Sequence, residues 1–485
     1  MRINYILNAL GLVLRYLSLI ILVPILVAIY YHDWNSIVPF VTASAVAFLT
    51  GLIIRNKKVD FDYLNNLKRT EGLAIVTLCW VTFALIAMIV YLFYGLSPIN
   101  ALFEATSGIT TTGATILTNF SAYPKTMFFF RSFSQWIGGM GIIIMFIAIL
   151  PQFAVAGRQM FFAEATGPVK DKITPRIKNT AITLWGVYII LTALEIICLK
   201  IAGMGLFESV CHSFSTIAAG GFSPNAASIS EYSPTVSWIM IVFMFLAGTN
   251  FALQYKVFFK GQITKLLLNE EFRFYCGVII VISAFLASAL IINQHFDFVT
   301  SIRESLFQVI SMLTSSGFAT LDFASWNTAE KVFLFTTAMI GACAGSAAGG
   351  VKAVRVLFAF KFLKREIAKL VHPQGVFTMK LDNKVIPNEI ADQILSFLVF
   401  YIVLCVVTSI IATVIESNVV VGMSGAIASL GNIGPGFADI GPMNNFNNLH
   451  TATKFVFIFN MIVGRLELVP FLIFLHPDLW KLRKQ

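Results

Sequence analysis

The sequence predicts an all-α polytopic membrane protein in which a unit of helix, re-entrant loop and helix occurs four times around one pore, after two extra N-terminal transmembrane helices. Two observations support this prediction. First, 58% of the 485 residues are hydrophobic and only 12% are charged, whereas a soluble domain carries about 25% charged residues. Second, four short apolar segments that end in a glycine-containing turn recur between long apolar stretches. The composition excludes a soluble enzyme, a disordered protein and a conventional nucleic-acid-binding protein.

Ten hydrophobic stretches are long enough to span a bilayer, which takes about 20 residues. They are residues 8–30, 37–54, 72–95, 126–151, 180–201, 235–257, 274–293, 330–360, 391–415 and 453–475. An even number of spans places both termini on the same side of the membrane. If that side is the cytoplasm, most of the 34 Lys and Arg residues lie in cytoplasmic segments, as the positive-inside rule requires. This topology also explains the net charge of +10 without an anionic partner.

Reactive or metal-binding groups of residues are not evident in the sequence. The six cysteines lie within apolar stretches and form no CxxC pair, so we expect small core side chains and no metal site or disulfide framework. HExxH and GxSxG motifs and paired intramembrane aspartates are absent, and the six histidines are scattered. We therefore expect that the protein is not an enzyme, and keep a membrane-embedded enzyme as a remote alternative.

Four moderately apolar segments follow the third, fifth, seventh and ninth expected spans, and each is too short to cross the membrane and return as helix. Each begins as a plausible short helix and ends in a small-residue turn, which is typical of a re-entrant loop that lines a cavity. The turns align on one glycine each, spaced roughly 100 residues apart, which indicates a fourfold pseudo-repeat. The aligned glycines are Gly113, Gly221, Gly317 and Gly434.

The repeat divides the chain into a two-helix N-terminal segment and four units. The expected boundaries are 1–70 for the N-terminal segment, 71–155 for repeat 1, 156–258 for repeat 2, 259–370 for repeat 3 and 371–485 for repeat 4. Polar residues stand nine positions before the aligned glycine in three of the repeats, and a glycine stands there in the fourth. These residues are Glu104, His212, Gln308 and Gly425. The fourth repeat has therefore diverged.

Four such loops in register predict a path for a cation. A dehydrated cation needs oxygen ligands in place of its water shell, and converging backbone carbonyls provide them without adding formal charge. Glycine permits positive φ and a close approach of the backbone, and the negative C-terminal ends of the preceding half-helices favour a cation. Thr110, Thr111 and Thr112 are small enough for their carbonyls to converge, and their counterparts are 218–220, 314–316 and 431–433. An ordinary outer loop explains one such segment, but not four in register.

The loop sequences TTTGAT, AAGGFS, TSSGFAT and GNIGPGF resemble the filter loops of the Trk/Ktr/HKT superfamily of cation transporters. The resemblance covers essentially the whole chain. The two extra N-terminal spans make it most similar to the TrkH branch, the potassium-translocating membrane subunits of bacterial Trk systems, rather than to the shorter KtrB type. The resemblance implies a multi-pass protein of the bacterial inner membrane that takes up potassium through a filter like that of a tetrameric potassium channel, folded into one chain.

The resemblance also implies which carbonyl groups coordinate potassium, namely those of the two residues before each aligned glycine. These residues are Thr111 and Thr112, Ala219 and Gly220, Ser315 and Ser316, and Asn432 and Ile433. Family members with serine at the first filter glycine tend towards sodium, so glycine in all four loops favours potassium. Only TTTG is close to a channel-like signature, and we therefore expect looser selectivity, with rubidium as a second ion. A sodium-selective or sodium-coupled transporter of the same architecture is the alternative.

The eighth expected span is unusually long and rich in small residues. Its stretch GACAGSAAGGVKAVR includes Gly345, Ser346, Gly349 and Gly350. These residues weaken a helix at mid-depth, so we expect a break that forms a loop below the filter. A close-packed helix face built on small residues is the alternative. The resemblance implies that this loop lies in the pore and acts as a gate.

Arg465 lies in the middle of the last expected span. A charge at that depth costs at least about 2.5 kcal/mol if it faces lipid, so Arg465 is expected to face protein or a cavity. We interpret it as a cation beneath the filter that repels potassium or anchors the gate loop, and the resemblance includes a matching arginine. An arginine paired to another helix is the alternative.

The cytoplasmic loops are too short to be nucleotide-binding domains, and no P-loop or GxGxxG motif in the required context is present. Any energy input or nucleotide sensing must therefore come from another chain, and we expect no cofactor here beyond potassium as the transported ion. The resemblance implies a peripheral nucleotide-binding regulator similar to TrkA, placed against a homodimer of this subunit. We expect membrane lipid as a further partner and no nucleic acid.

Overall fold

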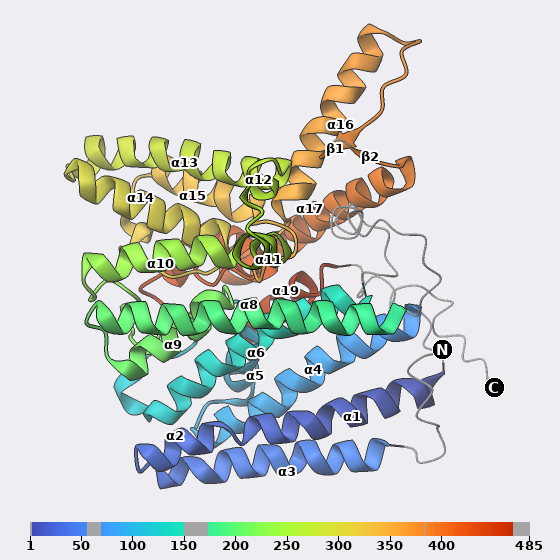
Figure 1. Cartoon of the computed structure of the whole chain (residues 1–485). Coiled ribbons are helices and arrows are strands. Elements are labelled where there is room, and N and C mark those ends of the chain that lie inside the picture. The colour runs from blue at the N-terminus through green and yellow to red at the C-terminus, as the bar shows by residue number, and fades with distance from the viewer. Residues whose placement is uncertain (1, 56–68, 150–172, 383, 469–485) are drawn as a thin grey trace.

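The computed structural model describes residues 2–55, 69–149, 173–382 and 384–468. The regular structure of these residues is almost entirely helical, and most of the long helices run side by side (Figure 1). The described sheet is a two-stranded hairpin of β1 (Lys380–Leu381) and β2 (Lys384–Val385). The prediction of an all-α polytopic membrane protein is therefore confirmed.

The N-terminal segment forms a helical pair at one side of the molecule. It contains α1 (Ile3–Ile21), α2 (Pro24–Tyr30), the short η1 (Trp34–Ser36) and α3 (Ile37–Ile54). The helices α1 and α3 approach closely because a glycine of each faces the other. A Cβ on Gly11 would lie 2.9 Å from the carbonyl oxygen of Gly51. Small residues allow this kind of close contact between membrane helices.

The rest of the chain repeats one pattern of long helix, half-helix, irregular segment and second helix. The first two units contain α4 (Arg69–Phe93), α5 (Pro98–Ile109), η3 (Phe120–Ala122) and α6 (Lys125–Ile149), then α8 (Ile173–Ile201), α9 (Leu206–Ile217), α10 (Pro234–Ala247) and α11 (Phe251–Lys260). The third contains α12 (Ile263–Leu267), α13 (Glu270–Gln294), α14 (Phe298–Leu313), η5 (Phe323–Ser325), α15 (Thr328–Ile340) and α16 (Ala353–Val371). The fourth contains α17 (Asn388–Glu416), α18 (Val419–Leu430), η6 (Ala438–Ile440) and α19 (Thr451–Arg465).

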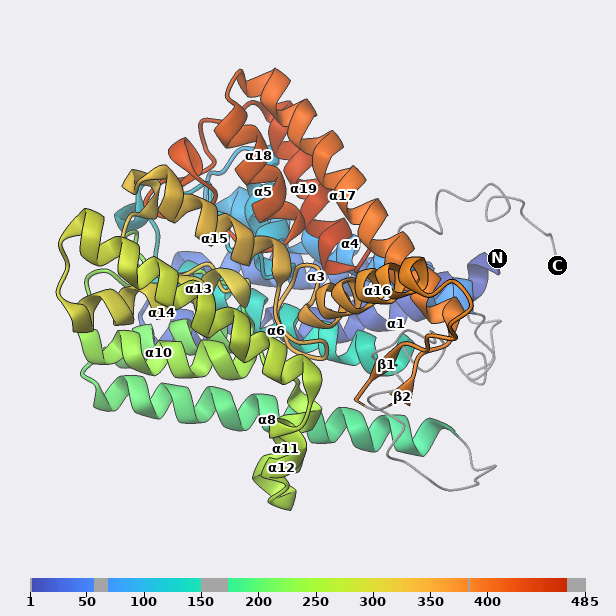
Figure 2. The ribbon, with the colours of Figure 1, turned by 90° about the horizontal axis from the view of Figure 1, so that it is seen from above.

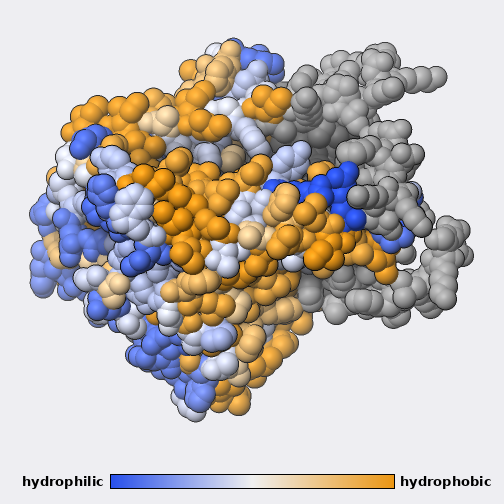
Figure 3. Space-filling view, turned by 90° about the horizontal axis from the view of Figure 1, so that it is seen from below, coloured by the Kyte–Doolittle hydropathy of each residue, from blue (hydrophilic) through white to orange (hydrophobic). Residues whose placement is uncertain are grey.

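The half-helices lie inside this arrangement and the long helices face outwards. Most side chains of α5, α9, α14 and α18 are buried, including serine, threonine and charged residues. By contrast, α17 exposes apolar residues such as Val403, Val406 and Ile410. Figure 3 shows hydrophobic residues over much of one face, with hydrophilic residues at the end away from the termini and in a smaller patch at the opposite end. Polar side chains inside and apolar side chains outside are expected of a bundle that surrounds a polar path through lipid.

By length and composition, six described helices can cross a membrane, or seven if the bent pair α10 and α11 is counted as one span. The expected sixth span, 235–257, is wrong as a single helix because α10 and α11 meet at 105°. Asn250 starts a new helix there: its side chain accepts hydrogen bonds from the amides of Ala252 (2.9 Å) and Leu253 (3.3 Å). Figure 2 shows α11 and α12 running across the direction of α8 and α10. The part of the expected tenth span after residue 468 lies outside the described residues.

Candidate functional site

The four half-helices end in the same backbone geometry. The residue two positions before each aligned glycine has positive φ, between 52° and 54°, and these residues are Thr111, Ala219, Ser315 and Asn432. The next amide bonds back to the carbonyl five residues earlier, as from Thr112 to Ser107 at 2.9 Å. This is a Schellman cap, which usually has glycine at the left-handed position. Other residues in this conformation carry strain of about 1–3 kcal/mol, and such strain clusters at functional sites.

The turns that follow the half-helices close into a ring. We call residues 110–113, 218–221, 314–317 and 431–434 the ring segments and their last residues the ring glycines. All four ring glycines have positive φ, from 71° to 103°. A Cβ on each of the first three ring glycines would meet a carbonyl oxygen of the next ring segment in the chain. A Cβ on the fourth ring glycine would meet a carbonyl oxygen of the first ring segment. The pairs of glycine and carbonyl are Gly113 with Gly220, Gly221 with Ser316, Gly317 with Ile433, and Gly434 with Thr112 (2.8 Å). The segments therefore surround one axis in chain order.

All eight residues predicted to bind potassium through their carbonyl groups lie in this ring. One carbonyl of each pair, from Thr112, Gly220, Ser316 and Ile433, lies at a contact between neighbouring segments. The second segment differs from a symmetric ring because Gln135 of α6 donates to the Gly220 carbonyl at 2.6 Å. The same side chain accepts from the backbone amide of Phe222 at 3.1 Å, so it bonds the residues on both sides of Gly221. The assignment of these carbonyls as ion ligands stays a prediction.

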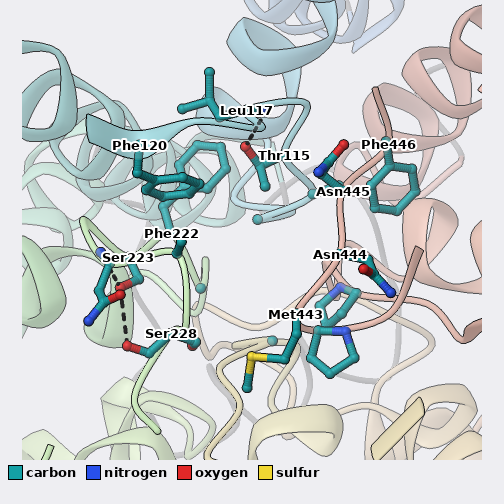
Figure 4. A pocket seen from close by; sticks show the side chains of 18 of the residues that line it. Thr115, Leu117, Phe120, Phe222, Ser223, Ser228, Met443, Asn444, Asn445 and Phe446 are labelled. Atoms are coloured by element: carbon teal, nitrogen blue, oxygen red, sulfur yellow. Dashed lines mark hydrogen bonds between the residues drawn. The ribbon is translucent and has the colours of Figure 1, made fainter. Parts of the chain in front are cut away.

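A cavity of about 100 Å³ opens on one side of the ring. Its lining includes Gly113, Gly221, Gly317 and Pro435, so all four repeats contribute to it. Figure 4 shows labelled side chains of the first, second and fourth repeats around the opening, among them Thr115 and Ser223. We call this cavity the outer vestibule, because the topology predicted from the sequence places this side of the ring outside.

The polar residues nine positions before the ring glycines hold the exit segments, by which we mean the residues directly after each ring glycine. Glu104 accepts from the amide of Ile116 at 3.0 Å. His212 Nε2 lies 3.1 Å from the hydroxyl of Ser223. The side-chain amide of Gln308 donates to the hydroxyl of Thr320 at 3.2 Å. Each half-helix thus fixes the backbone that leaves the ring.

The fourth repeat fixes its exit segment through a neighbouring residue. A Cβ on Gly425 would overlap the Phe457 ring, which occupies the space that a longer side chain would need. Ser424 instead accepts from the amide of Phe437 at 3.0 Å. The repeat spacing does not predict Ser424, because this serine stands one position before the site that holds the polar residue in the other repeats.

Below the ring, the eighth expected span is interrupted between α15 and α16, as predicted. We call residues 341–352 the intramembrane loop, and its Gly341, Gly345 and Gly350 have positive φ, from 74° to 78°. The amide of Gly349 donates to the hydroxyl of Ser315 at 2.6 Å, which ties the loop to the third ring segment. The close-packed helix that was the alternative is therefore excluded at this place.

Further hydrogen bonds hold the same loop, one to a neighbouring helix and one within the loop. The Ala344 amide donates to Glu271 of α13 at 2.5 Å. Ser346, predicted as part of the gate, is buried, and its hydroxyl donates to the Cys343 carbonyl at 2.6 Å. These bonds give the loop a defined conformation directly under the ring.

Arg465 is 2% exposed and lies at the last position of α19. Its guanidinium donates to the Ala347 carbonyl of the intramembrane loop at 2.9 Å and to the Gly138 carbonyl of α6 at 3.2 Å. Within the described ranges no carboxylate pairs with it, since the nearby Glu467 pairs with Arg355 at 2.5 Å. The contacts favour an anchor for the loop over an ion pair between helices.

A bundle of membrane-spanning helices whose four re-entrant segments close around one axis defines the class of pore-forming membrane transport proteins. A family model described as "TrkH: Cation transport protein" matches residues 70–481. The Trk system potassium uptake protein TrkH of Salmonella typhimurium is 36% identical over 97% of this chain and 98% of its own length. The chain belongs to the TrkH family of cation transport proteins.

Further relatives are similar over the same extent. The Trk system potassium uptake protein TrkG of Escherichia coli is 33% identical over 96% of both chains. The crystal structure of the potassium transporter TrkH from Vibrio parahaemolyticus superposes with a TM-score of 0.89 and 32% identity, and the match covers 99% of this chain and 100% of that chain. The fold predicted from the four aligned loops is therefore that of a solved transporter.

Proposed function

We propose that this protein takes up potassium across the bacterial inner membrane through the four ring segments. The observation that carries the proposal is the closed ring, in which four strained turns bring backbone carbonyls together around one axis. Carbonyl oxygens replace the water shell of a potassium ion, and the relatives are named potassium uptake proteins. A potential of 100 mV contributes about 2.3 kcal/mol per charge, or roughly 50-fold accumulation, so no chemical catalysis is needed.

The proposed gate is the intramembrane loop together with Arg465. Gly345, Ser346, Gly349 and Gly350 lie in this loop, and Arg465 holds its Ala347 carbonyl. A loop tied to the third ring segment on one side and to a buried cation on the other has the position needed to obstruct an ion that leaves the ring. Release of these bonds is the proposed opening step.

The proposed orientation places both termini in the cytoplasm, and the proposed boundaries between repeats are those given by the sequence. A homodimer and a nucleotide-binding regulator similar to TrkA are the proposed partners. The names of the relatives support a multi-component assembly, since each is called a protein of the Trk system. The chain itself supplies no nucleotide-binding motif, which supports regulation by a partner.

Rubidium flux into proteoliposomes that contain the purified protein, with sodium as competitor, tests the proposed function. We expect rubidium uptake that potassium inhibits at far lower concentration than sodium does. Equal inhibition by sodium would favour the alternative, a sodium-selective or sodium-coupled transporter. Absence of flux in folded protein at every imposed potential would contradict a transport function for the isolated chain.

A further inference from the structure

A buried arginine lies beside the outer vestibule and uses all three nitrogens of its guanidinium. Arg131 of α6 is 1% exposed. Its Nε donates to Glu104 at 2.8 Å, its Nη1 to the carbonyl of Ser223 at 3.1 Å, and its Nη2 to the hydroxyl of Thr115 at 3.1 Å. The ring of Phe222 lies 4.1 Å from its Cζ. Such a set of fixed donors is typical of a guanidinium that holds its partners in place.

These partners come from two different repeats. Thr115 belongs to the exit segment of the first repeat, and Glu104 fixes the next residue of that segment, Ile116, through its amide. Ser223 belongs to the exit segment of the second repeat, two residues after Gly221. One guanidinium therefore joins two neighbouring exit segments within a few residues of their ring glycines.

Two other contacts between neighbouring repeats use neutral groups. The amide of Ile229 donates to the Ala319 carbonyl at 3.0 Å, which joins the second and third repeats. The amide of Phe446 donates to the Thr115 carbonyl at 2.8 Å, which joins the fourth and first repeats. The contact between the first and second repeats thus differs from these two in depending on a buried ion pair.

We propose that Glu104 and Arg131 form a positioning pair that fixes the spacing of the first and second ring segments and thereby helps to set cation selectivity. This inference rests on the proposed function of the ring. Discrimination between cations depends on the number and spacing of carbonyl ligands. A change in the spacing of two of the four ring segments alters half of that ligand set.

The same pair also controls the charge of the vestibule. Arg131 lines the cavity, and an uncompensated cation there would repel an entering ion, because the effective dielectric constant is below that of water. Glu104 compensates this charge at 2.8 Å. Loss of Arg131 should therefore change the spacing of the ring segments, whereas loss of the Glu104 charge should change the charge of the vestibule, and the two effects can be measured separately.

Arg131→Met tests the spacing, because it removes the guanidinium that joins the two exit segments. We expect the preference for rubidium over sodium to fall roughly tenfold, equivalent to about 1.4 kcal/mol, with the rubidium uptake rate largely kept. Glu104→Gln tests the charge and leaves the vestibule with a net cation. We expect slower rubidium uptake that recovers as ionic strength rises. The double variant should regain the uptake rate but not the preference.

Lys125→Met is the matched control, because Lys125 is a cation on the same helix whose Nζ lies 4.7 Å from the ring centre of Tyr31. It should keep both the rate and the preference. If Arg131→Met does not fold, Thr115→Val removes one of its bonds with a smaller change and should still lower the preference. Wild-type preference in folded Arg131→Met, or in folded Thr115→Val, would overturn the inference. Absence of any preference in the wild-type protein would contradict the proposed function instead.

Discussion

At the scale of single residues, the ring depends on positions where a side chain cannot fit. Gly113 has a φ of 83°, and a Cβ there would overlap the Gly220 carbonyl oxygen of the neighbouring segment. We predict that Gly113→Ser displaces this carbonyl and lowers the preference for rubidium over sodium by at least about tenfold, since backbone strain of this kind costs roughly 1–3 kcal/mol. Competition flux in proteoliposomes measures this preference.

A glycine without neighbours provides the control for this variant. A Cβ on Gly277 of α13 would meet no atom within 4 Å. Gly277→Ser should therefore leave both flux and selectivity unchanged. Unchanged selectivity in folded Gly113→Ser would count against the first ring segment as part of the filter.

Arg465 gives a second prediction for a single residue. Arg465→Ala removes the donors to the Ala347 and Gly138 carbonyls and should release the intramembrane loop. We expect higher rubidium flux with unchanged selectivity, because the ring carbonyls are untouched. Arg465→Lys keeps the charge and should retain most of the restriction. Lower thermal stability together with lower flux in Arg465→Ala would instead identify a purely structural arginine.

At the scale of elements, the intramembrane loop forms because its sequence cannot continue a helix. Gly341, Gly345 and Gly350 take positive φ, and the amides and carbonyls of the loop are satisfied by side chains such as Glu271 and Arg465. We predict that deletion of a few residues within 345–350 shortens the obstruction and raises rubidium flux while selectivity is kept. A fall in flux with folding preserved would show that the loop supports the ring rather than obstructs the path.

The sequence predicted elements well where one local signal decides the conformation. The sequence predicts the ring glycines because positive φ and close backbone approach require glycine. It predicts the break after Ile340 because glycines cluster there. The bend after α10 was missed because residues 235–257 read as one apolar stretch, and its cause is the capping side chain of Asn250. A single asparagine does not predict a bend when apolar residues continue beyond it.

At the scale of the whole molecule, the repeats are alike in backbone and different in the side chains that support it. The first exit segment is held by an ion pair, the second by a histidine and Gln135, and the fourth by Ser424. These contacts join residues far apart in the chain, as Gln135 and Gly220 are. Local patterns therefore predicted the fold and the ring, whereas the supporting residues depended on tertiary packing, which such patterns do not specify.

The protein as a whole should accumulate its ion to the extent that the membrane potential allows. A ring of neutral carbonyls moves one charge for each potassium or rubidium ion, so the accumulation ratio should rise about tenfold for each ~59 mV of imposed potential. We predict this slope for rubidium in proteoliposomes at several potassium-diffusion potentials, with sodium and pH equal on both sides. If a sodium or proton gradient imposed at zero potential drives accumulation, a second ion is coupled and the passive-pore mechanism is wrong. Arg465→Ala should reach the same final ratio faster, because a gate changes the rate of approach and leaves the equilibrium unaltered.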